Sequence, residues 1–266
     1  MIFTAAFLSA VLAFSGQAAA AVPHQARYAS SNSAHSMHAS ATTSTASPSP
    51  TATTPANQLS LVQQLMLAPL AADRFALLPD NKDFVINLEP EPVPAGKGGN
   101  LVAANRKTFP ALVGAGAGMA VGVIKPCGIN TFHVHPRSAE LQILIKGSLV
   151  VEMTPENGVL DPATGKRRVI RNTLSEFDMT PFYQGSVHHQ FNPNCTDAVF
   201  VASFASEDFG TGQVVDEVFS MDKNAIIDTF GATLSGDDVE RIKAGLPESI
   251  VQGVEVCMQK CYNHRV

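Results

Sequence analysis

The stretch GINTFHVHPRSAELQILIKG, residues 128–147, decides which fold and which chemistry we expect of this chain. His133 and His135 stand two positions apart in a run of apolar and β-branched residues, so on a strand both imidazoles point to one face. Glu140 has the wrong parity for the same uninterrupted strand. Residues 136–138 supply a break, because the proline at their start cannot donate to a strand ladder. We therefore expect the two imidazoles and the carboxylate to face one interior.

A second stretch, QGSVHHQFN at residues 184–192, offers a third imidazole. On strand alternation His188, Gln190 and Asn192 share one face, whereas His189 lies on the other. A metal ion is the usual reason to bury imidazoles beside a carboxylate. The set His133, His135, Glu140 and His188 suits a first-row divalent ion and leaves positions for water or substrate. Any one of these histidines, taken alone, is better interpreted as a hydrogen-bonded core residue or a surface residue than as a metal ligand.

Together the two stretches, G-x4-HVH-x4-E-x6-G and G-x2-H-x3-N, resemble the two cupin motifs in the form found in germins and germin-like proteins. The segments HPRSAE, KGSLVVEM and FASEDFGTGQ are similar to those of the fungal and slime-mould spherulin-like secreted cupins. The resemblance covers residues 60–262. It implies an all-β jelly-roll barrel with a single metal site, short helices at both ends of the domain and helices at its C-terminus. The implied cofactor is manganese, with iron or zinc as alternatives.

The chain divides by composition into three parts. Residues 1–20 are almost uncharged and end in small residues, which predicts a secretory signal peptide. Residues 21–57 are rich in Ser, Thr, Ala and Pro, which predicts a disordered linker whose scattered histidines lie outside the site. Residues 58–266 then form the cupin domain, with the barrel at about 84–205 and C-terminal helices at about 222–262.

Within that domain, hydrophobic spacing predicts one or two short helices in residues 59–78, and Pro and Gly punctuation predicts many short strands. A first strand is expected at 84–88 and a loop at 90–100. Later strands are expected at 118–124, 131–136, 139–145, 148–154, 166–173, 176–183, 186–192 and 197–205. Helices are expected at 222–230 and at 250–261, and another helix is expected to begin after Ser235, which would be its N-cap.

The net charge and its distribution limit the classes of partner that the protein can bind. The formal net charge is −5, and no cluster of Lys or Arg occurs in the sequence, so nucleic acid and anionic membrane are excluded. The charged fraction is 15%, lower than the roughly 25% of ordinary soluble proteins. The resemblance implies a homo-oligomer (dimer, trimer or hexamer) in which the C-terminal helices clasp a neighbour. Capping of the monomer's own barrel is the alternative.

Four cysteines in a chain with a secretory signal indicate disulfides. In the fold that the resemblance implies, the strands bearing His133 and His188 run antiparallel, which favours a Cys127–Cys195 pair. Cys257 and Cys261 share one face of the expected last helix, and the options for them are a mutual bond, free thiols or bonds to the barrel. Asn194 begins the only glycosylation sequon, and a bridged cysteine inside it would disfavour its use.

The resemblance implies a secreted protein of the extracellular space or cell wall, with superoxide or a small acid such as oxalate as substrate. Germin oxalate oxidases place two asparagines over the metal. Asn130 matches one and is our candidate for substrate contact, with a turn residue as the alternative, but Ala120 stands at the other position. Whether the protein is an enzyme therefore stays open. The alternatives are a non-catalytic, metal-stabilised wall or spore-coat protein and a metal-dependent isomerase or lyase. In every case we expect metal loss as the pH falls toward and below about 6, because histidine binds metal as neutral imidazole.

Overall fold

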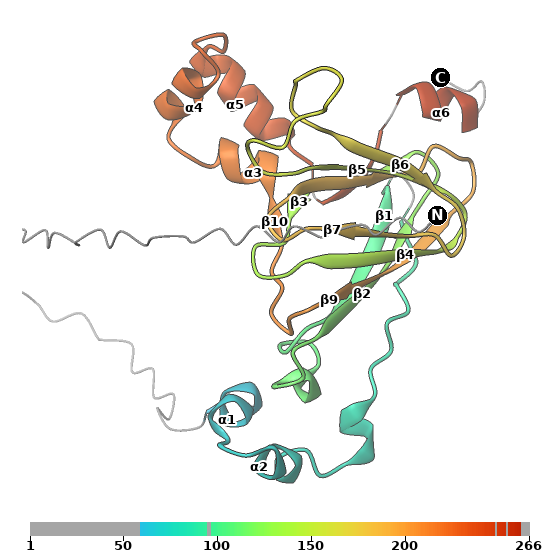
Figure 1. The fold of residues 1–266 in the computed structure, drawn as a ribbon, viewed down its shortest axis with the longest axis vertical. Coiled ribbons are helices and arrows are strands. Elements are labelled where there is room, and N and C mark those ends of the chain that lie inside the picture. Colours follow the sequence, from blue (N-terminus) through green and yellow to red (C-terminus); the bar gives the residue numbers. More distant parts are fainter. Residues whose placement is uncertain (1–58, 95–96, 248, 254, 262–266) are drawn as a thin grey trace, which may run out of the picture. The chain divides into compact units, whose positions relative to one another are not determined.

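Two antiparallel β-sheets face each other in the computed structural model, which describes residues 59–94, 97–247, 249–253 and 255–261 (Figure 1). The expected signal peptide and linker lie outside these residues. The five-stranded sheet has the order β1 (Gly99–Ala104), β2 (Gly118–Ile124), β9 (Ala198–Phe204), β4 (Glu140–Lys146) and β7 (Met179–Phe182). The six-stranded sheet has the order β10 (Gly212–Gln213), β3 (Gly128–Val134), β8 (Val187–Phe191), β5 (Leu149–Thr154) and β6 (Ile170–Leu174), with β11 (Ile250–Gln252) also paired to β3.

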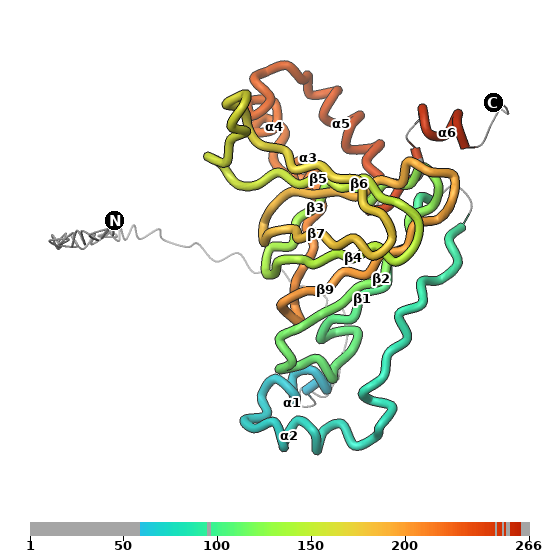
Figure 2. Tube along the Cα trace, turned by 45° about the vertical axis from the view of Figure 1, so that its right-hand side comes forward, coloured from blue at the N-terminus to red at the C-terminus, as the bar shows by residue number. Residues whose placement is uncertain are grey.

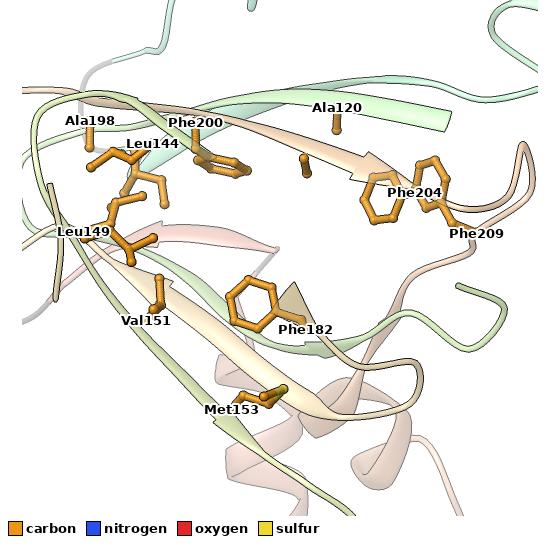
Figure 3. Close-up of a cluster of buried hydrophobic side chains, with 13 residues drawn as sticks. Ala120, Leu144, Leu149, Val151, Met153, Phe182, Ala198, Phe200, Phe204 and Phe209 are labelled. Carbon is orange, nitrogen blue, oxygen red and sulfur yellow. The ribbon is translucent and has the colours of Figure 1, made fainter. Parts of the chain in front are cut away.

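The core lies between the two sheets, because each sheet turns one apolar face inward. On β2 and β9 alternate residues are buried, as expected for strands with one covered face. Side chains of both sheets meet in the middle (Figure 3), and Leu144, Leu149 and Phe200 are at most 1% exposed. Burial of one such side chain contributes about 1.5–3 kcal/mol. This core fixes the spacing between the sheets.

A bulge in β3 sets the direction of its polar side chains. The pairing of β3 with β8 shifts register between Asn130 and His133. On a regular strand these two residues would point to opposite faces, since they are three positions apart. Because an extra residue is accommodated between them, both are buried in the interior. Beyond the bulge, β3 ends at Val134, and the chain turns at Pro136 before β4 begins at Glu140, as the sequence predicts.

Short helices flank the sheets. α1 (Leu61–Leu67) and α2 (Ala71–Ala76) confirm the expected N-terminal pair. After the barrel, α3 (Val214–Phe219), α4 (Lys223–Thr229) and α5 (Gly236–Gly245) lie together (Figure 2) around a small second core of Phe219, Ile226 and Val239. The Ser235 hydroxyl accepts a hydrogen bond from the Asp238 backbone N–H, which confirms the predicted cap. None of the helices described here is long and apolar enough to cross a membrane.

Two expected elements are wrong. Residues 84–88 form no strand; a 3-10 helix (Asn81–Phe84) ends at the first of them, and β1, which begins at Gly99 near the end of the expected loop, takes the edge of the five-stranded sheet. A strand needs a partner for its backbone groups, and β2 has only one free edge to offer. The expected helix 250–261 starts as β11, because Ile250 and Val251 pair with β3, and only α6 (Glu255–Cys261) is helical. Neither β10 nor α3 was expected.

The favoured Cys127–Cys195 disulfide is also wrong. The structure pairs Cys127 with Cys257 and Cys195 with Cys261. The two barrel cysteines do lie at one end of the β3–β8 strand pair, where the Cys127 N–H donates to the Asn192 carbonyl at 3.1 Å. The helix α6, however, presents its own two cysteines, one turn apart, to this end of the barrel. Each cysteine of α6 forms a disulfide with one barrel cysteine, so the two α6 cysteines do not bond to each other.

Candidate metal centre

The four predicted ligands come together inside the barrel. His133 lies on β3, His135 directly follows that strand, Glu140 begins β4 and His188 lies on β8. None of the four is more than 6% exposed. One donor atom from each residue lies within 4.8 Å of the others. Two imidazoles therefore reach in from the six-stranded sheet and the carboxylate from the five-stranded sheet, while the loop between the sheets supplies the third imidazole.

Backbone carbonyls fix the orientation of all three rings. The Nδ1 atoms of His133, His135 and His188 lie 2.7, 2.6 and 2.8 Å from the carbonyl oxygens of Thr131, Gly210 and Ser186, respectively. A carbonyl oxygen only accepts, so each Nδ1 carries the proton and donates it. Each Nε2 then keeps its lone pair and presents it to the interior. Metal-binding histidines are held in this way.

The centre consists of acceptors that need a cation between them. The Glu140 Oε2 atom lies 2.9 Å from the His135 Nε2 and 3.3 Å from the His188 Nε2. With the ring protons already on Nδ1, only a shared proton or a metal ion makes these contacts favourable. Neighbouring ligands of a six-coordinate ion with bonds of about 2.1 Å stand about 3 Å apart, close to both distances. The residues therefore fit a first-row divalent ion.

His133 and Glu140 keep the protonation states that metal binding needs well below pH 6. Burial and then the neighbouring His188 ring lower the pKa of His133 from 6.5 to about 3. Burial raises the pKa of Glu140, but a proton shared with the facing Nε2 atoms of His135 and His188 lowers it by more, so it falls from 4.5 to about 2. His133 is thus neutral and Glu140 charged well below pH 6. The expected loss of metal near pH 6 does not follow from either residue.

Three phenylalanines pack the ligand rings and were not singled out from the sequence. Phe182 stacks on His188 with ring centroids 4.3 Å apart. Phe204 and Phe209 meet the His135 ring edge-on, at 4.7 and 5.7 Å. Phe182 and Phe204 lie at buried positions of strands whose residues alternate in burial. That alternation is the sequence signal from which they could have been predicted to face the interior. Close packing of this kind restricts the rotamers of the ligands.

Asn130 lies on β3 and lines the cavity beside the ligands, which excludes the turn-residue alternative. Its Nδ2 donates to the Gln190 Oε1 at 2.8 Å, and the Gln190 Nε2 donates to the Gln142 Oε1 at the same distance. These three buried amides form a file through the interior. Asn130 thereby has one donor committed to the protein, and its contact with substrate stays a prediction.

The other polar residues of the second stretch lie outside the centre, as predicted. His189 turns away and pairs with Glu152, at 2.9 Å between Nε2 and Oε2. The Asn192 Nδ2 donates to the carbonyls of Ile124 and Thr196, at 2.9 and 2.7 Å. Asn192 therefore ties the end of β8 to neighbouring loops.

A cavity of about 310 Å³ adjoins the ligands. His133, His135 and Glu140 form one part of its lining. Its other described lining residues are Leu101, Ala103, Ala120, Asn130, Phe200, Ala202, Phe204, Phe209, Thr211, Gln213, Ser249 and Ile250. The volume is at the lower end of the range for small-molecule sites, about 300–1,000 Å³.

Comparison with known proteins places the chain among cupins. A family profile described as Cupin matches residues 87–232. Spherulin-1A of Physarum polycephalum is 34% identical over 206 residues, which cover 76% of this chain and 78% of the relative. Germin-like protein 9-3 of Oryza sativa subsp. japonica is 32% identical over 145 residues, 54% of this chain and 63% of the relative. A structure of recombinant oxalate oxidase with glycolate superposes with a TM-score of 0.55 at 20% identity, over 62% of this chain and 81% of that one. That likeness concerns the fold.

Proposed function

Because this chain belongs to the cupin family, with germin-like and spherulin-like relatives, we propose that it is a manganese-binding extracellular oxidoreductase. The observation that carries the proposal is the convergence of three Nε2 lone pairs and one carboxylate oxygen on a common point, with all three Nδ1 atoms held by carbonyls. A cation between these acceptors would make their close approach favourable. Iron and zinc fit the same donors, and manganese is chosen because the germin resemblance implies it.

When bound, the ion supplies a redox couple and coordination positions beyond its four protein ligands. The chain's own residues do the rest. His133, His135 and His188 hold the donor atoms in place through their carbonyl partners, and Glu140 offsets part of the ion's charge. Phe182 covers the His188 ring, and the cavity, whose wall includes Phe204, leaves the centre accessible to a small reactant. This supports superoxide dismutation or oxidation of a small acid.

Two disulfides within the described residues support a location outside the cell. Disulfides form and persist in oxidising compartments and are rare in reducing ones. Extracellular space or cell wall is therefore part of the proposal.

A non-catalytic, metal-stabilised coat or wall protein is the second candidate. It is favoured by Ala120 in the cavity wall and by the commitment of the Asn130 amide to Gln190, which leave few groups to orient a substrate. The oxidoreductase and the coat or wall protein would share the metal centre, but only the oxidoreductase would turn over a substrate.

Elemental analysis of the purified wild type beside His133→Ala and His189→Ala tests the metal centre. We expect about one equivalent of a first-row ion in the wild type and in His189→Ala, and none in His133→Ala. Retention of metal by His133→Ala would refute the centre. Superoxide and oxalate assays on the metal-loaded and metal-free wild type then separate the two candidates, since a scaffold with full metal occupancy shows no turnover. Native zinc would rule out redox chemistry, because zinc has no second accessible oxidation state.

A further inference from the structure

The two walls of the cavity differ in polarity. Apart from the ligand Glu140, the five-stranded sheet contributes only apolar side chains: Leu101, Ala103, Ala120, Phe200, Ala202 and Phe204. Besides His133 and His135, the rest of the lining carries the amides of Asn130 and Gln213 and the hydroxyls of Thr211 and Ser249, together with the apolar Phe209 and Ile250. Among the described residues that line the cavity, none is Lys or Arg. One side of the cavity therefore suits oxygen atoms, and the other suits hydrocarbon.

A small dianion fits this cavity poorly. With one carboxylate on the ion, the second carboxylate of oxalate would meet no cationic side chain, only neutral amides and hydroxyls on one side and a wall of apolar side chains on the other. A charge moved from water to such a wall without a partner is strongly disfavoured. A ligand with one charged, oxygen-rich head and a hydrocarbon body satisfies both walls.

We propose that the cavity takes small α-keto or α-hydroxy monocarboxylates with a branched aliphatic tail. This inference rests on the proposed metal centre. The head supplies two adjacent oxygen donors, the number of positions that a six-coordinate ion has left beside four protein ligands. The tail lies against the wall formed by Leu101, Ala103, Ala120 and Ala202. The small side chains of the three alanines leave room for the branch.

Isothermal titration calorimetry of the manganese-loaded protein tests the proposal with pyruvate and α-ketoisocaproate. The two acids have the same head, so the contribution of the ion cancels in the ratio of their affinities. Each buried methylene strengthens binding by roughly fourfold, so three further carbon atoms give a preference on the order of 50-fold for α-ketoisocaproate. Equal affinities, or no binding of either acid at millimolar concentration, would overturn the proposal.

The variant Ala120→Asn places an amide in the apolar wall, and Met119→Asn is its matched control. Met119 is the preceding residue of β2, points outward and is 41% exposed. We expect Ala120→Asn to lower the affinity for α-ketoisocaproate at least tenfold, to leave that for pyruvate nearly unchanged and to raise that for oxalate. Met119→Asn should change none of the three. An Ala120→Asn protein that keeps the preference of the wild type contradicts the proposed wall.

Ala202→Ser provides a second variant of the same wall with a smaller change in volume. It should reduce the preference for α-ketoisocaproate, and an unchanged preference counts against the proposal. Measurement of the metal content before the titrations separates a failure of the proposed ligand class from a failure of the proposed metal centre. Full metal occupancy without a preference for the aliphatic acid refutes this inference alone, whereas failure to take up metal refutes the proposed function itself.

Discussion

Replacement of Glu140 by glutamine distinguishes a metal ligand from one half of a buried ion pair. In the structure the Glu140 Oε2 lies 2.9 Å from the His135 Nε2 and 3.3 Å from the His188 Nε2, and the residue is 2% exposed. If these contacts serve as a structural ion pair, removing the negative charge leaves a positive charge buried. Loss of one partner from a buried pair costs about 3–5 kcal/mol.

If Glu140 is a metal ligand, the result is different. In the metal-free variant the glutamine amide can donate to the two Nε2 lone pairs, and each such hydrogen bond contributes about 0.5–1.5 kcal/mol. We therefore expect the metal-free variant to lie within about 1 kcal/mol of the metal-free wild type, or above it. The variant should lose its response to metal, because a neutral amide does not offset the charge of the ion.

Thermal and urea unfolding at pH 7, with a chelator and with manganese, measure both quantities. Manganese at 100 times its dissociation constant stabilises the wild type by about 2.7 kcal/mol. For a domain of this size that raises the Tm by roughly 5–10 °C. Glu140→Gln should show no rise, whereas Glu152→Gln, whose carboxylate pairs with His189 outside the centre, should show the full rise. A chelated Glu140→Gln protein destabilised by about 3 kcal/mol or more would refute the metal-ligand reasoning.

Three further predictions concern pH, the disulfides and the amide file. Because the pKa of His133 falls from 6.5 to about 3 on folding, the unfolded chain binds the proton first, and stability present above pH 6.5 is lost as the pH falls toward 3. Metal-free protein should lose about 2 kcal/mol between pH 7.5 and pH 5 in urea unfolding, and a flat profile would contradict this. Replacing Cys195 and Cys261 by alanine opens a link across 66 residues and should lower the unfolding free energy by up to about 4 kcal/mol. An unchanged urea midpoint would contradict that role. Gln190→Leu leaves the Asn130 Nδ2 and the Gln142 Oε1 without partners, and a loss of about 2–4 kcal/mol with metal uptake retained is expected. Loss of metal from a folded Gln190→Leu protein would show instead that the file positions the ligands.

The convergence of the four candidate ligands could be predicted from the sequence because strand parity and a proline break are local properties. Two histidines at alternate positions share a face on any strand, and residues 136–138 permit Glu140 to return to that face. The buried position of Asn130 follows from a bulge between β3 and β8. A bulge depends on how two distant strands pair, so parity along one strand alone places Asn130 on the wrong face relative to His133.

The errors share a physical cause, which is competition between segments far apart in the sequence. Cys127 and Cys195 are near each other, but α6 brings two more cysteines to the same place, and its arrival depends on β11 pairing with β3. Residues 84–88 have strand-like composition, yet the single free edge of β2 belongs to β1. The tautomer of His135 could not be predicted either, because the carbonyl that fixes its ring comes from Gly210, 75 residues along the chain.

The candidate metal centre and the disulfides both involve β3. His133 lies on β3 and Glu140 on the opposite sheet, so the donor atoms meet only while the two sheets keep their spacing. β3 is held by β8 on one edge and by β10 and β11 on the other, and β11 leads into the helix that both disulfides attach to the barrel. Ser249 and Ile250, at the start of this C-terminal segment, also line the cavity. Cleaving the disulfides therefore loosens one edge of a ligand-bearing strand and one wall of the cavity together, so reduction of the loaded protein should weaken its hold on the metal as well as lower its stability.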